Sequence, residues 1–179
     1  KQKDLGLVTI GGGCSGTLVN RSWVLTADHC VTSTGTVGGP TAVLANLAIT
    51  AAWTPRSAVP SRVVRNWGPV TGLDVALLFL GRGDLGVANV QLFHVDPVDT
   101  SQTITKYGRG IFAFATQSGS LAIPSQGDGL YRSALLTPSS AGENFITVQP
   151  NGAGQIANGG DSGGPDFVTA PNGISLGLA

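Results

Sequence analysis

The sequence has 179 residues, of which 41% are hydrophobic and only 11% charged, with 27 glycines and a formal net charge of zero. This composition excludes a disordered chain, which needs few apolar residues and a large net charge. A balanced charge gives no reason to expect nucleic acid or an anionic membrane surface as a partner. No apolar run approaches the roughly 18 residues that a membrane-spanning helix requires.

Short apolar runs, bounded by Gly, Pro, Asn and Ser, predict an all-β chain because no stretch holds a helical period. The predicted strands of the amino-terminal half are residues 5–10, 16–20, 23–26, 42–47, 62–66 and 75–80. Those of the carboxy-terminal half are residues 103–107, 111–115, 130–136, 145–149 and 174–178. A single helical turn is expected at residues 26–30. Many short strands at this spacing are typical of barrels or a sandwich.

The segment 93–102 is more polar than its surroundings and contains a proline, so it is interpreted as a linker. The predicted organisation is therefore a first β unit over residues 1–92, the linker 93–102, and a second β unit over residues 103–179.

Two cysteines, Cys14 and Cys30, are the only ones in the chain. In a glycine-rich β chain of low charge, such a pair indicates one disulfide and an oxidising compartment. Two buried free thiols are the alternative. With His29, the two cysteines could nominally supply three zinc ligands, but a disulfide would leave no thiolate free.

Three segments contain residues suited to nucleophilic catalysis. His29 follows a predicted strand in LTADHC, and histidine exchanges protons readily near neutral pH. Asp74 opens an apolar strand, where a carboxylate is costly to bury without hydrogen bonds. Ser162 lies in GGDSGGP, where flanking glycines let backbone amides converge on one point. Taken singly, each has a plainer interpretation: a surface histidine, a strand cap and a glycine-rich loop.

Together, CSGTLV at residues 14–19, WVLTADHC at 23–30, DVALL at 74–78 and GDSGGP at 160–165 resemble the trypsin-like (chymotrypsin-fold) serine peptidases in sequence and order. The resemblance implies two antiparallel β-barrels with the active site in the cleft between them. It also implies a Cys14–Cys30 disulfide and a catalytic triad of His29, Asp74 and Ser162, with the amides of Gly160 and Ser162 forming the oxyanion hole.

A member of this family is expected to be a secreted, monomeric endopeptidase that needs no cofactor or metal. Its partners would be polypeptide substrates and protein protease inhibitors, with no nucleic acid and no membrane. A catalytically inactive or arrested member that acts as a binding module is the alternative. An unrelated β-sandwich adhesin would require the four motifs to be accidental.

The sequence departs from the family pattern at several positions. No Ile or Val amino terminus is present to pair with Asp161, so this residue has another partner or the oxyanion loop is immature. The match implies a chain clipped at both ends. Asp28 replaces the usual alanine beside His29, as an exposed substitution or as a competing partner of the imidazole. Asn158 replaces a bracing cysteine, and Ile156 stands at the base of the specificity pocket, which predicts a preference for apolar side chains.

Overall fold

The computed structural model describes residues 1–32, 46–65, 73–81, 85–86, 91, 93–94, 96–111, 116–118, 121–123, 126–142, 145–169 and 175–178. Within these residues the fold is built from antiparallel strands, and the helical element is the 3-10 turn η1 (Asp28–Cys30). The expectation of an all-β fold is confirmed.

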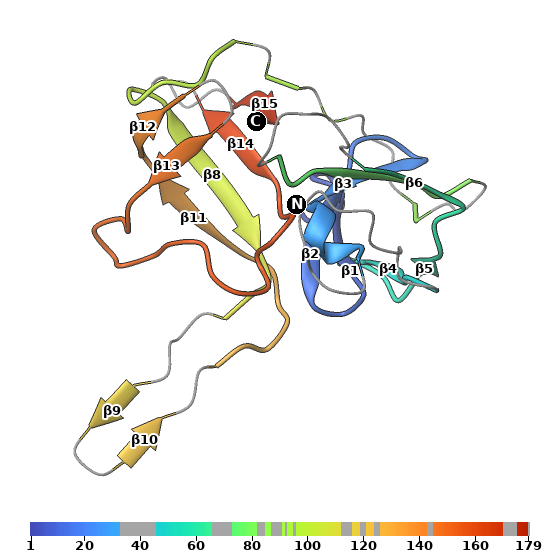
Figure 1. The fold of residues 1–179 in the computed structure, drawn as a ribbon, viewed down its shortest axis with the longest axis horizontal. Helices are drawn as coiled ribbons and strands as arrows, with labels where there is room; N and C mark the ends of the chain where they lie inside the picture. The colour runs from blue at the N-terminus through green and yellow to red at the C-terminus, as the bar shows by residue number, and fades with distance from the viewer. Residues whose placement is uncertain are drawn as a thin grey trace.

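The amino-terminal part forms a seven-stranded antiparallel sheet in the order β5-β4-β1-β2-β3-β7-β6, on the right of Figure 1. Its strands are β1 (Leu7–Ile10), β2 (Cys14–Leu18), β3 (Trp23–Thr26), β4 (Ile49–Ala51), β5 (Ser57–Ala58), β6 (Arg62–Arg65) and β7 (Ala76–Phe79). Burial alternates along β3, β4 and β7, whereas β1 and β2 are buried along most of their length. The buried side chains of this curled sheet pack into a common core. The large, fully buried members of that core include Val8, Ile10, Leu18, Ile49 and Leu78.

The carboxy-terminal part contains a four-stranded sheet in the order β11-β8-β14-β15, on the left of Figure 1. These strands are β8 (Thr103–Gly108), β11 (Arg132–Leu136), β14 (Asp166–Thr169) and β15 (Ser175–Leu178). Two further pairs are β12 (Pro138–Ala141) with β13 (Ile146–Val148), and β9 (Thr116–Ser118) with β10 (Leu121–Ile123). The β9–β10 pair projects away from the rest of the molecule (Figure 1).

The two sheets meet along a shared apolar cluster that contains Leu7 and Val19 from one side and Tyr107 and Phe167 from the other. The rings of Tyr107 and Phe167 pack edge to face, with centroids 5.9 Å apart. Because this cluster joins residues far apart in sequence, it fixes how the two halves of the chain face each other.

Most of the predicted strands are present, with ends shifted by a few residues. Residues 42–45 and 112–115, which make up most of two predicted strands, lie outside the described residues. Six observed strands were not predicted from the sequence: β4, β5, β9, β10, β12 and β14. The predicted helical turn is shorter than expected, because Thr26 still belongs to β3.

Candidate active site

His29 and Asp74 form a hydrogen-bonded pair. The ring nitrogen Nδ1 of His29 lies 2.6 Å from Oδ2 of Asp74, and the backbone N–H of His29 donates to Oδ1 at 2.9 Å. An ionised carboxylate can only accept hydrogen bonds, so Nδ1 carries the ring proton. This tautomer leaves Nε2 of the neutral ring as a proton acceptor. Both side chains are about one-third exposed, at 30% and 31%.

Strand pairing explains why these two residues meet. Strands β3 and β7 are antiparallel, and Thr26 at the end of β3 is opposite Ala76 at the start of β7. His29 lies three positions after Thr26 and Asp74 two positions before Ala76, so both emerge at the same edge of the sheet.

Cys14 and Cys30 are joined in a disulfide with a Cα–Cα distance of 6.0 Å, within the ordinary range. The disulfide ties the start of β2 to η1, the turn that carries His29. The nitrogen and sulfur atoms of Cys14, His29 and Cys30 all lie within 4.8 Å of one another. Because both sulfurs are bonded to each other, they are not available as thiolate ligands for zinc.

Ser162 lies in the loop between β13 and β14, here called the serine loop. Backbone hydrogen bonds hold this loop against β2. The carbonyl of Ser162 accepts a hydrogen bond from the N–H of Ser15 at 2.9 Å. The hydroxyl of Ser15 donates to the carbonyl of Gly160, also at 2.9 Å. The hydroxyl of Thr26 donates in turn to the carbonyl of Ser15 at 2.8 Å. This chain of bonds connects the serine loop to the end of β3, close to the histidine turn.

Ser162 is therefore next to the disulfide and to the histidine. Sγ of Cys30 lies 3.7 Å from the carbonyl oxygen of Ser162 and 3.6 Å from Nε2 of His29. Within the described part of the chain, the hydroxyl of Ser162 and Nε2 of His29 are not hydrogen-bonded to each other. Such bonds are often long in enzymes without substrate and shorten when it binds.

The loop also carries amides that can act as donors. Gly160 has a φ of +93°, a conformation that favours glycine. Among the described residues, the amides of Gly160 and Ser162 donate to no acceptor. They are therefore free to donate to a ligand.

Asp161, between these two amides, has partners of its own. One oxygen accepts from the N–H of Gly110 at 2.7 Å, and the other from the N–H of Asn158 at 2.9 Å. Of the two alternatives for Asp161, the structure supports another partner. The close approach also explains Gly108, where a Cβ would lie 2.0 Å from Oδ1 of Asp161.

The expectation that Asp28 is exposed is wrong. Its relative exposure is 0%, and its carboxylate forms a bidentate ion pair with Arg65 on β6, with N–O distances of 2.6 and 2.8 Å. The hydrogen bond to Asp28 raises the pKa of Arg65 above its usual value. The alternative of Asp28 as a competing partner is also not what the structure shows, since Asp74 holds the imidazole. The sequence did not indicate this pair, because Arg65 lies 37 positions after Asp28 and reaches it only through the pairing of β6 with β7.

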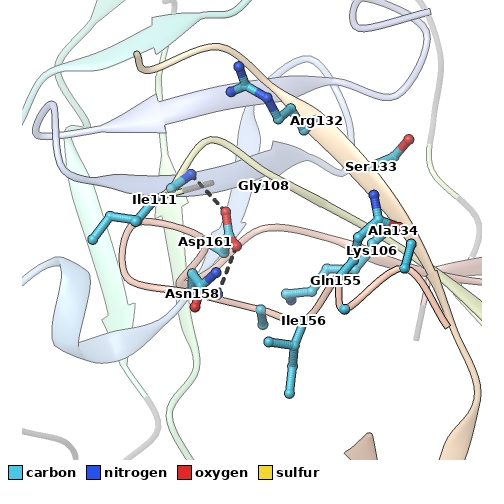
Figure 2. A pocket seen from close by; sticks show the side chains of 14 residues that line it. Lys106, Gly108, Ile111, Arg132, Ser133, Ala134, Gln155, Ile156, Asn158 and Asp161 are labelled. Atoms are coloured by element: carbon cyan, nitrogen blue, oxygen red, sulfur yellow. Dashed lines mark hydrogen bonds between the residues drawn. The ribbon is translucent and has the colours of Figure 1, made fainter. Parts of the chain in front are cut away.

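A cavity of about 220 Å³ is lined in part by residues of the serine loop (Figure 2). Its lining includes Ile156, Asn158 and Asp161 from the loop, together with Lys106 on β8 and Arg132 on β11. None of His29, Asp74 or Ser162 lines it. The cavity is thus separate from the histidine–aspartate pair, and Ile156 as the base of a specificity pocket stays a prediction.

The sequence and the fold of the chain are similar to those of known proteins. The sequence model of a family described as Trypsin matches residues 5–175. No curated protein matches the sequence. Among similar solved structures is one described as the atomic-resolution structure of HBP. It has a TM-score of 0.67 and 15% sequence identity, and the alignment covers 99% of this chain and 80% of that chain. At this identity the likeness shows a shared fold.

The residues that the structure describes include no helix long and apolar enough to cross a membrane.

Proposed function

The chain belongs to the trypsin family, and from this premise we propose that it is a secreted serine endopeptidase that hydrolyses peptide bonds through an acyl-enzyme. The observation that carries the proposal is the pairing of His29 with Asp74 at 2.6 Å, beside a serine loop anchored on the same strands. Family membership alone would fit an inactive protein. The arrangement of this pair is what favours activity.

In this mechanism Ser162 attacks the carbonyl carbon of the substrate while Nε2 of His29 removes the hydroxyl proton. His29 then returns that proton to the leaving amine, which departs and leaves an acyl-serine. Water, activated by the same nitrogen, releases the acyl group and regenerates the serine. Asp74 keeps the proton on Nδ1 and stabilises the imidazolium that forms in each step.

The negative charge that develops on the substrate oxygen would be stabilised by the amides of Gly160 and Ser162. Preorganised donors of this kind each contribute about 2.7–4 kcal/mol to transition-state stabilisation. The positive φ of Gly160 and the two bonds that hold Asp161 support a loop whose amides are already oriented. No bound cofactor or metal takes part in these steps.

The catalytic residues would come from two units. We assign residues 1–92, with His29 and Asp74, to the first barrel and residues 103–179, with Ser162, to the second. The segment 93–102 would connect them. The bond from the N–H of Ser15 to the carbonyl of Ser162 supports a site at the junction of the two units.

For substrate choice we retain Ile156 as the residue at the base of the specificity pocket, which predicts apolar side chains at the cleaved bond. Faster cleavage after arginine than after leucine or phenylalanine in a peptide library would contradict this preference. The disulfide supports secretion into an oxidising compartment. Polypeptides and protein protease inhibitors are the proposed partners of a monomeric enzyme.

The proposal is tested by treating the purified protein with a phosphonofluoridate and locating the adduct by peptide mass spectrometry. Such reagents react rapidly with a serine only where a base and an oxyanion hole surround it. We expect a stoichiometric adduct on Ser162 and none in Ser162→Ala.

A second candidate is a non-catalytic binding module of the same fold. The observation that favours it is that, among the residues the structure describes, the hydroxyl of Ser162 is not hydrogen-bonded to Nε2 of His29. The same experiment separates the two functions, because folded protein without an adduct would exclude the endopeptidase and leave the binding module.

A further inference from the structure

The Asp28–Arg65 ion pair lies directly beside the proposed catalytic histidine. Both side chains are buried, at 1% exposure for Asp28 and 4% for Arg65. Taking two charges out of water costs much of what their attraction returns, so such a pair contributes little net stability. Removing one partner is far more damaging, because it leaves the other charge buried and unpaired. Stability alone therefore gives no good reason for this pair.

The pair joins the turn that carries His29 to the strand that is paired with β7. Asp28 is in η1, the same turn as His29. Arg65 is on β6, opposite Ala76 on β7, and Asp74 lies just before β7. The Asp28–Arg65 and His29–Asp74 contacts thus connect η1 to β6 and to the start of the neighbouring strand β7.

The turn that carries His29 follows directly after Thr26, which is paired with Ala76 on β7. Ala27, at its N-cap, provides no side-chain hydrogen bond. The turn is closed by backbone bonds from Cys30 to Ala27 and from Val31 to Asp28, and the disulfide restrains its carboxy-terminal end. Asp28 is the side chain that fixes its beginning.

The two carboxylates have different partners. Arg65 is a permanent cation, and its guanidinium is aligned with both oxygens of Asp28. The imidazole of His29 is hydrogen-bonded to Asp74.

We propose that Asp28 and Arg65 are positioning residues, whose ion pair fixes η1 against β6 and β7 and so holds Nδ1 of His29 on the carboxylate of Asp74. The inference rests on the proposed endopeptidase function. It assigns a purpose to Asp28, the buried carboxylate directly before His29.

The test is the double variant Asp28→Ala/Arg65→Met, which removes both charges together and leaves none unpaired. A misplaced imidazole should lower kcat by about 10- to 100-fold, since displacements near 1 Å can have effects of that size. KM should stay within about twofold, because the pair does not touch substrate. By proton NMR, the hydrogen-bonded Nδ1 proton of His29 should exchange faster with water or disappear.

Asp128→Ala is the matched control. It breaks another bidentate ion pair, in which both N–O distances to Arg132 are 2.7 Å, on the exposed surface of the other sheet. This control should retain kcat and the Nδ1 resonance.

A folded double variant with full kcat and an unchanged Nδ1 resonance would overturn the proposal and leave a structural role. If that variant does not fold, Asp28→Asn/Arg65→Gln, which keeps polar groups at both positions, is measured by the same criteria. The NMR measurement does not need activity. Wild-type protein that shows the Nδ1 resonance but no phosphonofluoridate adduct would refute the proposed function while still testing the positioning role.

Discussion

Gly163, next to Ser162, combines a restricted conformation with a lack of space. Its φ is +73°, and a Cβ built there would lie 2.2 Å from Oγ1 of Thr26 and 2.6 Å from the carbonyl oxygen of Ser15. Gly154 has the same φ of +73°, with nothing within 4 Å of the corresponding position. The two glycines therefore share the backbone requirement and differ in crowding.

We expect Gly163→Ala to lower the free energy of unfolding by about 1–3 kcal/mol more than Gly154→Ala, because only the first adds overpacking to the strain. Gly163→Ala should also lose phosphonofluoridate labelling of Ser162, since the loop must move away from Thr26. Urea denaturation of both variants measures the first effect. Equal destabilisation would show that the loop accommodates the methyl group.

Individual residues differ in how far the sequence predicts them. His29 and Asp74 were identified from motifs, and their pairing follows from the β3–β7 register. The partners of Asp161 were not predictable, because its carboxylate accepts from the backbone amides of Gly110 and Asn158, and every residue except proline has such an amide. The burial of Asp28 was also not predictable. Its partner is Arg65, which reaches it only because β6 pairs with β7.

Among the elements, most strands that contain a longer apolar run were predicted, whereas β14 was not. It spans Asp166–Thr169 (DFVT), begins directly after Pro165, and has an apolar run of only Phe167 and Val168. Its stability comes from its place between β8 and β15 and from the burial of Phe167 and Val168. Pairing across the sheet, which a single sequence does not reveal, thus decides this strand.

The disulfide is the covalent connection between β2 and η1, over a sequence separation of 16. For a loop of this length, Cys14→Ala/Cys30→Ala should lower the free energy of unfolding by about 3 kcal/mol. The loss should also reduce kcat, because η1 carries His29. Urea denaturation and peptidase assays on the variant and on reduced wild-type protein provide the measurement. A variant that keeps the wild-type midpoint would show that strand pairing around η1 maintains the stability without the disulfide.

In the whole molecule, a tyrosine side chain joins the two sheets that support the serine loop. Tyr131, just before β11, extends to the opposite sheet, where its hydroxyl donates to the carbonyl of Val8 and accepts from the N–H of Gly16 at 3.4 Å. Val8 and Gly16 are paired across β1 and β2. One side chain thus connects the carboxy-terminal half to the strands that support Ser15 and, through it, the carbonyl of Ser162.

Tyr131→Phe removes these two bonds and keeps the ring. We expect the free energy of unfolding to fall by about 1–3 kcal/mol at pH 8, since the carbonyl of Val8 loses a buried partner. Phosphonofluoridate labelling of Ser162 should slow as well, because the contact of Tyr131 with the opposite sheet supports the position of the serine loop. An unchanged urea midpoint at pH 8 would show that the apolar cluster alone holds the sheets together.

The same tyrosine should make stability depend on alkaline pH. Burial raises the pKa of the Tyr131 phenol above its ordinary value of 10.0. Above pH 10 the unfolded chain therefore releases this proton while the folded protein retains it. Because the folded state then binds more protons, its stability falls as pH rises through this range. Urea midpoints at pH 8 and pH 10.5 should accordingly decrease more for wild type than for Tyr131→Phe, which has no phenol to titrate. Equal decreases in the two proteins would mean that the phenol ionises as readily in the folded protein as in the unfolded chain. The contacts of Tyr131 between the two sheets would then not keep the phenol neutral.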